Sequence, residues 1–305
     1  MTKYIVGRVL MAILVAITVS AITFLMLNFA GDPAVALAGE GASAETIAQI
    51  RTQYGFDRPI VVQYFDWLTR AITGDLGDSY YFKLPVAHLL SQHLSVTIIL
   101  GLLGITFALL VSLPLGILAA VKPNSIYDRI SLFVAVVGQA IPSFWFGLLL
   151  IVVFSIKLRW LPASGASSWQ GFVMPTIVLG YYATPALMRL TRAGMLEVLS
   201  SDFIRTARAK GLSSTKILFK HALRNAVIPV VSLAAVQMGF MLGGSIVVES
   251  VFALPGAGLL AWQSIARNDL PTMQALILVF SMFYIVFTLV ADLLNAWLDP
   301  RLRKS

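Results

Sequence analysis

Six long apolar runs, none of which contains Asp, Glu, Lys or Arg, constrain this 305-residue chain more than any other feature. About 20 apolar residues in a helix cross the hydrocarbon core of a bilayer. Because the backbone must satisfy its own hydrogen bonds inside lipid, such runs become membrane-spanning helices. The runs are Val9–Ala30, Val96–Val121, Ile130–Ile156, Phe172–Met188, Ile228–Val248 and Ala275–Ala291. We therefore predict an all-α integral membrane protein with about six transmembrane helices.

The composition excludes several other classes of protein. Hydrophobic residues make up 58% of the chain and charged residues only 12%, whereas about a quarter of a soluble domain is charged. No cysteine is present, which excludes disulfides and cysteine-based metal sites. His88 and His93 stand five residues apart, in poor helical register for a shared ligand. We expect no metal site and no catalytic residue.

The first run has two interpretations. Lys3 and Arg8 give it a basic start, and the small residues around Ala36 resemble a signal-peptide cleavage site. The apolar core of a signal peptide is typically about 7–15 residues long, and Val9–Ala30 is longer. We expect a retained membrane helix.

The distribution of charge orients the spans. With an inside amino terminus and six spans, most of the 22 Lys and Arg residues fall in inside segments, and most of the 14 acidic residues fall outside. Short cytoplasmic loops are enriched in Lys and Arg. We therefore expect both termini in the cytoplasm. The same bias explains the net charge of +8 without nucleic acid as a partner.

The long outside segment, Gly31 to Leu94, is expected to be an ordered subdomain. It contains an amphipathic stretch, Ile60–Ile72, turn signals at Gly74–Asp75 and Gly77–Asp78, and many aromatic residues. The aromatic residues could lie at the headgroup level of the membrane, or form a cap over the outer mouth that receives a partner. Both interpretations stay open, and they are compatible.

A basic segment, Ser200 to Arg224, separates the fourth and fifth runs. Ser200 or Ser201 can cap a first helix with Asp202 in its first turn. Gly211 can end this helix, Ser213 can cap a second one, and Pro229 marks the next span. The pattern predicts two short helices bent at Gly211, with Phe203, Ile204 and Ala207 on one face. The basic residues are Arg205, Arg208, Lys210, Lys216, Lys220 and Arg224.

Three functions fit a basic helical pair of this kind. It could bind anionic lipid, bind DNA as a helix-turn-helix, or dock into a cytoplasmic partner that moves it. The flanking spans make DNA binding awkward. The chain has no phosphate-binding loop, since Gly239–Ser245 is glycine-rich but lacks Lys. Its charge-free runs offer no proton or sodium relay. A secondary transporter or channel is the alternative to an energy input from another subunit.

Particular motifs carry a family resemblance. Thr206–Gly211 (TARAKG), His221–Ala226 (HALRNA) and Ile228–Pro229 resemble the cytoplasmic "EAA" loop of bacterial ABC importer permeases of the dipeptide, oligopeptide, glutathione and nickel type. Arg205–Ala207 stands where the general pattern has Glu-Ala-Ala, a departure that resembles the peptide group's own variant. Further motifs follow in the family's order: Gly31–Pro33, Gly74–Gly77, Ile141–Phe144, Leu161–Pro162, Glu249–Gly258 and Asp269–Pro271.

The resemblance covers essentially the whole chain and implies a type I ABC importer permease. Residues 1–94 would form the first transmembrane helix and an extracytoplasmic subdomain. Residues 95–300 would form the permease domain, with a coupling loop at 189–227. The implied location is the bacterial inner membrane, and the implied solutes are short peptides, with glutathione, nickel chelates and oligosaccharides as alternatives.

The resemblance also implies partners. These are a second, similar permease, one or two kinds of cytoplasmic ATPase subunit that bind ATP and Mg²⁺, an extracytoplasmic substrate-binding protein and membrane lipid. The chain itself would hold no cofactor and would not be an enzyme.

The candidate site residues fall into three groups. The expected ATPase-coupling residues are Asp202, Phe203, Arg205, Thr206, Ala207, Arg208, Ala209, Lys210 and Gly211. Polar residues inside the runs either line a solute pathway or bond to nearby backbone, and they are Gln139, Ser143, Gln237 and Ser245. Glu249 and Asp269, at the outer ends of two spans, either form an outer gate, meet the binding protein or lie in water. Gly239 and Gly243 permit close helix approach, including to a second permease.

Overall fold

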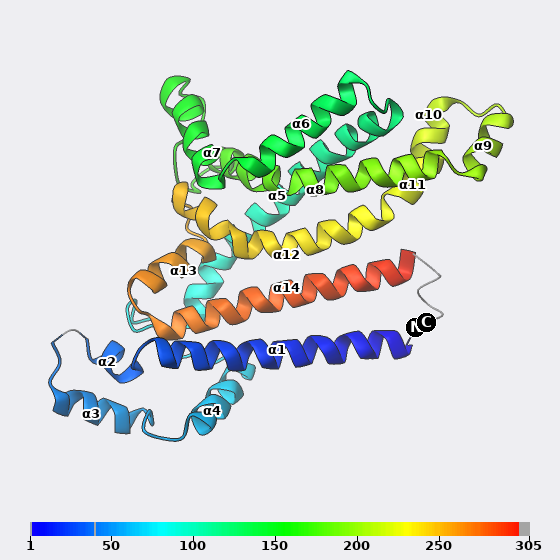
Figure 1. Ribbon diagram of the computed structural model, residues 1–305. Coiled ribbons are helices and arrows are strands. Elements are labelled where there is room, and N and C mark those ends of the chain that lie inside the picture. Colours follow the sequence, from blue (N-terminus) through cyan, green and yellow to red (C-terminus); the bar gives the residue numbers. More distant parts are fainter. Residues whose placement is uncertain (1, 40, 299–305) are drawn as a thin grey trace.

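The computed structural model describes residues 2–39 and 41–298. Within these ranges the chain is helical, and its only strand-like pairing is an isolated bridge between Asp78 and Pro85. The basic residues Arg301, Arg303 and Lys304, which contribute to the predicted orientation, lie outside the described residues. The helical segments (Figure 1) are α1 (Thr2–Ala30), α2 (Pro33–Ala38), α3 (Ala44–Gln53), α4 (Ile60–Ile72), α5 (Val86–Val121), α6 (Ile126–Ala140), α7 (Ser143–Leu150), η1 (Ile151–Lys157), η2 (Trp169–Phe172), α8 (Val173–Leu199), α9 (Asp202–Ala209), α10 (Ser214–Lys216), η3 (Ile217–Ala222), α11 (Leu223–Ala226), α12 (Ile228–Val251), α13 (Ala257–Ala266) and α14 (Leu270–Leu298).

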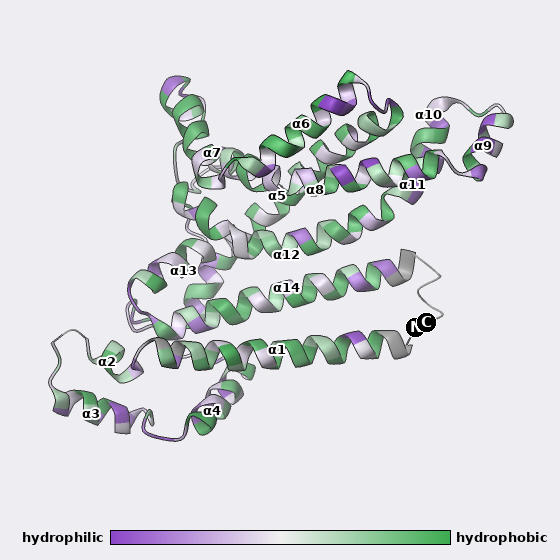
Figure 2. Ribbon diagram, in the orientation of Figure 1, coloured by the Kyte–Doolittle hydropathy of each residue, from purple (hydrophilic) through white to green (hydrophobic). Residues whose placement is uncertain are grey.

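The membrane-spanning character of the chain is confirmed. In the described part of the chain, five helices are long and apolar enough to cross a bilayer, and a bent pair of helices could supply a sixth span. The five apolar stretches are Ile5–Met26, Val86–Val121, Trp169–Leu199, Ile228–Val251 and Leu270–Asn295. Hydrophobic residues cover α1, α12 and α14 along most of their length (Figure 2). The prediction of an all-α membrane protein with about six spans is correct.

The third apolar run is not one continuous helix as its composition predicts. It is split between α6 and the helix formed by α7 and η1, which meet at 103°. Pro142 has no backbone N–H and disfavours a helical conformation for the residue before it. Ile141 accordingly has extended dihedral angles, φ −86° and ψ 123°. The bend places Gln139 and Ser143 on either side of a corner inside the apolar region.

The two ends of the helical bundle differ in what they carry (Figure 1). Helices α1 and α14 lie side by side and run in opposite directions. The segment α9–α11 lies at the same end of the bundle as the start of α1 and the end of α14, whereas α2–α4 and α13 lie at the opposite end. The basic segment is therefore on one side of the bundle and the predicted outer subdomain on the other.

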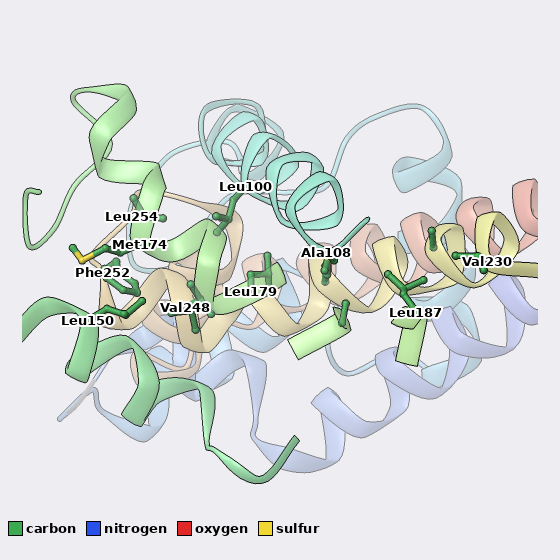
Figure 3. Close-up of a cluster of buried hydrophobic side chains, with 14 residues drawn as sticks. Leu100, Ala108, Leu150, Met174, Leu179, Leu187, Val230, Val248, Phe252 and Leu254 are labelled. Carbon is green, nitrogen blue, oxygen red and sulfur yellow. The ribbon is translucent and has the colours of Figure 1, made fainter. Parts of the chain in front are cut away.

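The core forms where α5, α7, α8 and α12 meet. Leu100, Leu179 and Val248, from α5, α8 and α12, belong to one buried cluster (Figure 3). Glycines allow α5 and α8 to approach closely, because a Cβ on Gly180 would lie 2.5 Å from the Gly104 carbonyl oxygen. Helices in lipid associate through such close packing, since lipid removes the hydrophobic driving force between them.

The segment predicted to form an outer subdomain packs on α1. Trp67 of α4 is buried, and its ring centroid lies 5.9 Å from that of Phe24 of α1. The Tyr64 hydroxyl shares a hydrogen bond of 2.9 Å with the Ser20 hydroxyl of α1. One face of the amphipathic helix α4 therefore packs on the first transmembrane helix.

Candidate functional sites: the intramembrane cavity and the basic hairpin

The basic hairpin, α9 to α11 (Asp202–Ala226), has the predicted bend. Gly211 has φ +74°, in the left-handed region that glycine adopts without steric cost. The Ser213 hydroxyl accepts a hydrogen bond from the Lys216 N–H at 3.4 Å and caps the second helix. Ser201 occupies the cap position of α9, but its hydroxyl donates to the Val198 carbonyl at 2.6 Å instead of capping. The middle of the second helix is π-helical, which the sequence pattern did not predict.

One side of the hairpin is anchored on the membrane helices. Ile204 and Ala207 are buried in a cluster with Met195 of α8 and Ile117 of α5. The prediction that Phe203 shares this buried face is wrong, because its side chain is 48% exposed. Phe203 is one residue, or about 100° of helix rotation, from Ile204, and this rotation points it away from α8.

The other side of the hairpin is a mixed basic and apolar surface. Phe203 and Phe219 are exposed, at 48% and 56%. Asp202 and Arg205 form an exposed ion pair at 3.1 Å, which contributes little to stability. Of the expected coupling residues only Ala207 is buried. The exposed ones are Asp202, Phe203, Arg205, Thr206, Arg208, Ala209, Lys210 and Gly211.

A cavity of about 1020 Å³ lies within the membrane-spanning region. It is lined by residues of α1, α6, α7, α8, α12 and α14, including Gln139, Ser143 and Gln237. Its described lining contains several aromatic rings, among them Tyr182 and Tyr284, and no charged side chain. Three of the four predicted pathway residues therefore border one cavity.

Ser245, the fourth predicted pathway residue, does not reach this cavity. Its side chain is completely buried, and its hydroxyl donates to the Leu242 carbonyl at 2.9 Å. The alternative of bonding to nearby backbone is correct for Ser245. Gly239 and Gly243 of the same helix both border the cavity. They differ in steric space, because a Cβ on Gly239 would contact Tyr284 of α14 at 3.1 Å, whereas a Cβ on Gly243 would meet nothing within 4 Å.

Glu249 and Asp269 are internal connections in this structure, not exposed groups. Both side chains are completely buried. The Glu249 carboxylate accepts hydrogen bonds from the Thr97 hydroxyl at 2.7 Å and the Leu259 N–H at 2.9 Å. The expectation that these acids lie in water or reach a soluble partner is wrong for this conformation. The glycine-rich turn after Glu249 explains its burial, because a Cβ on Gly256 would lie 2.3 Å from the carboxylate.

Asp269 ties the outer subdomain to α14. It accepts hydrogen bonds from the Ser79 hydroxyl at 2.6 Å, the Tyr80 N–H at 2.9 Å and the Thr272 hydroxyl at 2.7 Å. Burial, with the charge of Asp269 adding to it, raises the pKa of Tyr80 to about 12. The Tyr80 phenol therefore stays protonated in the physiological pH range.

A second cavity, of about 580 Å³, lies beneath the outer subdomain. Aromatic residues and charges of both signs line it, together with Gln274 of α14. The Gln274 side-chain nitrogen is buried and has no hydrogen-bond partner in the described chain. The sequence pattern did not single out Gln274, although this residue lies directly before the last apolar run.

Two polar connections between α6 and α8 were also missed. The Arg192 guanidinium donates two hydrogen bonds of 2.8 Å to the Asp128 carboxylate. Arg189 donates to the Gln139 side-chain oxygen at 3.1 Å. Both arginines come shortly after Met188, the end of the apolar run. Their spacing of three residues, which puts them on one face of a helix, is the sequence feature that could have indicated these contacts.

His88 and His93 have local partners. His88 Nε2 lies 3.0 Å from the Gln92 side-chain nitrogen, and His93 Nδ1 lies 2.7 Å from the Leu89 carbonyl oxygen. Across residues 2–39 and 41–298, no three His, Cys, Asp or Glu side chains form a group that could hold a metal ion.

Comparison with known proteins identifies similar chains. The family described as "Binding-protein-dependent transport system inner membrane component" matches residues 112–304, and the corresponding N-terminal family matches residues 1–101. The glutathione transport system permease protein GsiC of Escherichia coli O6:H1 is 43% identical over 304 residues, which cover 99% of each chain. GsiC of Escherichia coli strain K12 is 42% identical, and GsiC of Salmonella choleraesuis 41%, with the same coverage.

Solved structures give a similar fold at lower identity. An inward-facing structure of the MetNI methionine ABC transporter matches with a TM-score of 0.58 and 19% sequence identity. The match covers 69% of this chain and 96% of that chain. At this identity the likeness concerns the fold alone.

Proposed function

The chain belongs to the family of binding-protein-dependent transport system inner membrane components, and from this premise we propose that its solute is glutathione or a closely related short peptide. It is the membrane-spanning permease subunit of a binding-protein-dependent ABC importer. The observation that carries the choice of solute is the similarity to glutathione permeases, at 41–43% identity over 99% of the chain.

The intramembrane cavity supports this solute class. Ligand sites commonly enclose about 300–1,000 Å³, and this cavity is at the upper end, with about 1020 Å³. A glutamine amide has both donors and an acceptor, so Gln139 and Gln237 can pair with peptide groups of a moving solute. The aromatic and aliphatic lining provides apolar contact without a fixed charge.

The basic hairpin is proposed as the ATPase-coupling element. ATP and Mg²⁺ would be bound by separate cytoplasmic subunits, into which Phe203 and Phe219 insert. Exposed aromatic side chains surrounded by cations suit docking to a protein surface. Ile204 and Ala207 would transmit the motion, because they pack on α8, and α8 lines the cavity.

This role fixes the proposed orientation and partners. The hairpin, the start of α1 and the end of α14 lie at one end of the bundle, which we assign to the cytoplasm. The end with α2–α4 would face the binding protein. A second permease would complete the pathway.

Charge reversal on the hairpin tests the proposal. Arg205 and Arg208 are exposed, so the double variant Arg205→Glu/Arg208→Glu should fold normally. In proteoliposomes containing the assembled complex and binding protein, we expect it to lose both glutathione uptake and glutathione-stimulated ATP hydrolysis. Arg129→Glu, an exposed arginine on α6 at the same end, is the matched control and should retain both activities.

Three results would each contradict a part of the proposal. Survival of both activities in the double variant would exclude the coupling role. Glutathione uptake by the purified chain alone, driven by an ion gradient without ATPase subunits, would identify a secondary transporter instead. A wild-type complex that imports another solute, but neither glutathione nor a short peptide, would reject the solute class and leave the permease role intact.

A further inference from the structure

Arg189 connects the intramembrane cavity to a positive charge. Its Nη1 donates a hydrogen bond to the Gln139 side-chain oxygen at 3.1 Å, across 50 positions of the chain. Gln139 borders the cavity, while the described lining itself carries no charge. The Arg189 guanidinium is therefore a positive charge that is hydrogen-bonded to a cavity-lining side chain.

The helix register places Arg189 on the cavity face of α8. Tyr182 and Ala186 of this helix line the cavity, and Arg189 follows them by seven and three residues. Residues with these spacings share one face of an α-helix. Because α8 runs toward the basic hairpin, Arg189 lies at the hairpin end of the cavity, one turn beyond Ala186.

The charge of Arg189 has no counter-ion in the part of the chain that the structure describes. No Asp or Glu of residues 2–39 and 41–298 lies within ion-pair distance of it. Arg192, three residues further along α8, differs, because the Asp128 carboxylate pairs with it. Arg189 is also exposed, with a single side-chain hydrogen bond, which leaves most of its five N–H donors available.

A cation beside an apolar span is energetically costly and is typical of a functional position. A guanidinium binds a carboxylate through two parallel hydrogen bonds, with more geometric specificity than an ammonium. We propose that Arg189 binds a carboxylate of the transported solute at the hairpin end of the cavity, and that Gln139 orients its guanidinium. The inference rests on the proposed function and assigns an anionic, carboxylate-bearing solute to the pathway.

A comparison of charged and neutralised ligands tests this site. The permease–ATPase complex, without binding protein, is placed in phosphatidylcholine nanodiscs. Binding of glutathione and of its diethyl ester, which lacks free carboxylates, is then measured by titration calorimetry. We expect the wild type to bind glutathione roughly tenfold more tightly than the ester, a difference typical of one charge-assisted contact. Arg189→Gln should abolish this difference without changing the affinity for the ester.

Two further variants separate a specific contact from a general effect of charge. Arg129→Gln removes the same charge from an exposed site on α6 and should retain the tenfold preference. Arg189→Lys keeps the positive charge but lacks the planar guanidinium that forms two parallel hydrogen bonds. It should therefore retain only part of the preference for glutathione over the ester. The thermal unfolding temperature of each variant, measured in the same nanodiscs, should match that of the wild type.

Several outcomes would overturn the inference. These are equal binding of glutathione and ester by the wild type, no detectable glutathione binding, or a preference that survives in Arg189→Gln. Nanodiscs with added phosphatidylglycerol provide another arm: if Arg189→Gln weakens retention of this lipid but not glutathione binding, the arginine binds a lipid phosphate instead. Uptake by the wild-type complex with binding protein is measured in parallel, so that failure of the proposed function is recognised separately.

Discussion

Thr97 of α5 donates a hydrogen bond to the Glu249 carboxylate of α12 at 2.7 Å, and both side chains are completely buried. The same threonine hydroxyl accepts a hydrogen bond from the Ala257 N–H at 2.8 Å. Ala257 is the first residue of α13. One side chain therefore links three helices near the end of the bundle opposite the hairpin.

Thr97→Val keeps the shape of this side chain but removes both hydrogen bonds. Because it leaves a buried carboxylate oxygen and a buried N–H unpaired, we expect a loss of about 2–3 kcal/mol of unfolding free energy. Denaturant unfolding in detergent measures the change. Thr106→Val is the matched control, since the Thr106 hydroxyl is exposed and bonds only within α5. An equally large loss of unfolding free energy in this control would contradict a special role for the Thr97 hydrogen bonds.

Gly180→Ala should separate α5 from α8. The new Cβ would lie 2.5 Å from the Gly104 carbonyl oxygen and 2.7 Å from the Phe107 ring, so the helices must shift. We expect a cost of about 1–3 kcal/mol, the usual range for overpacking, and a lower thermal unfolding temperature. Gly7→Ala, where nothing lies within 4 Å, should be neutral or slightly stabilising. Equal effects at the two positions would contradict the close approach.

Arg192→Met leaves the Asp128 carboxylate buried without its partner. Since Asp128 is 3% exposed, we expect a loss of about 3 kcal/mol. The double variant Asp128→Leu/Arg192→Met should lose less than the single variant, because it leaves no uncompensated charge. Unfolding of the wild type, the two single variants Arg192→Met and Asp128→Leu, and the double variant in one detergent gives the coupling energy. Additive losses would exclude a direct interaction.

Gly211 tests backbone conformation separately from steric space. A Cβ there meets nothing within 4 Å, yet φ is +74°. Gly211→Ala should cost about 1–2 kcal/mol because of the left-handed conformation, and Gly211→Asn should cost less because asparagine adopts this region more readily. Hydrogen exchange of the Leu212 and Ser213 amides should rise more in the alanine variant. Equal exchange in both variants would argue against strain at this position.

Local sequence patterns predicted the elements that local chemistry controls. The apolar runs located the membrane helices, because transfer of about 20 apolar residues into lipid depends little on their neighbours. Gly211 and Pro229 located the hairpin bend and the start of α12, because their backbone preferences act within one turn. In the third run, the continuous apolar composition predicted one helix and not the bend at Pro142, although the proline is present in the sequence.

Candidate site residues were harder to assign, because the sequence of a helix does not reveal which other helices its side chains will contact. Gln139 and Gln237 border the cavity, whereas Ser245, an equally plausible polar residue, turns back to its own helix. The sequence places Glu249 and Asp269 at the ends of spans, where exposure is expected. In the structure both are buried and bonded to residues 152 and 190 positions away, Thr97 and Ser79. Nothing in a local pattern reports partners at such distances.

The sequence by itself determined that this chain spans a membrane, where its basic hairpin begins and bends, and which family motifs it carries. Those properties follow from hydrophobicity, charge and backbone preference over short stretches. Only the tertiary structure decided that Phe203 faces outward, that Glu249 is internal and that Arg189 reaches Gln139 at the edge of the cavity. These relationships depend on how helices rotate and pack against one another, and this packing is set by contacts between residues far apart in the chain.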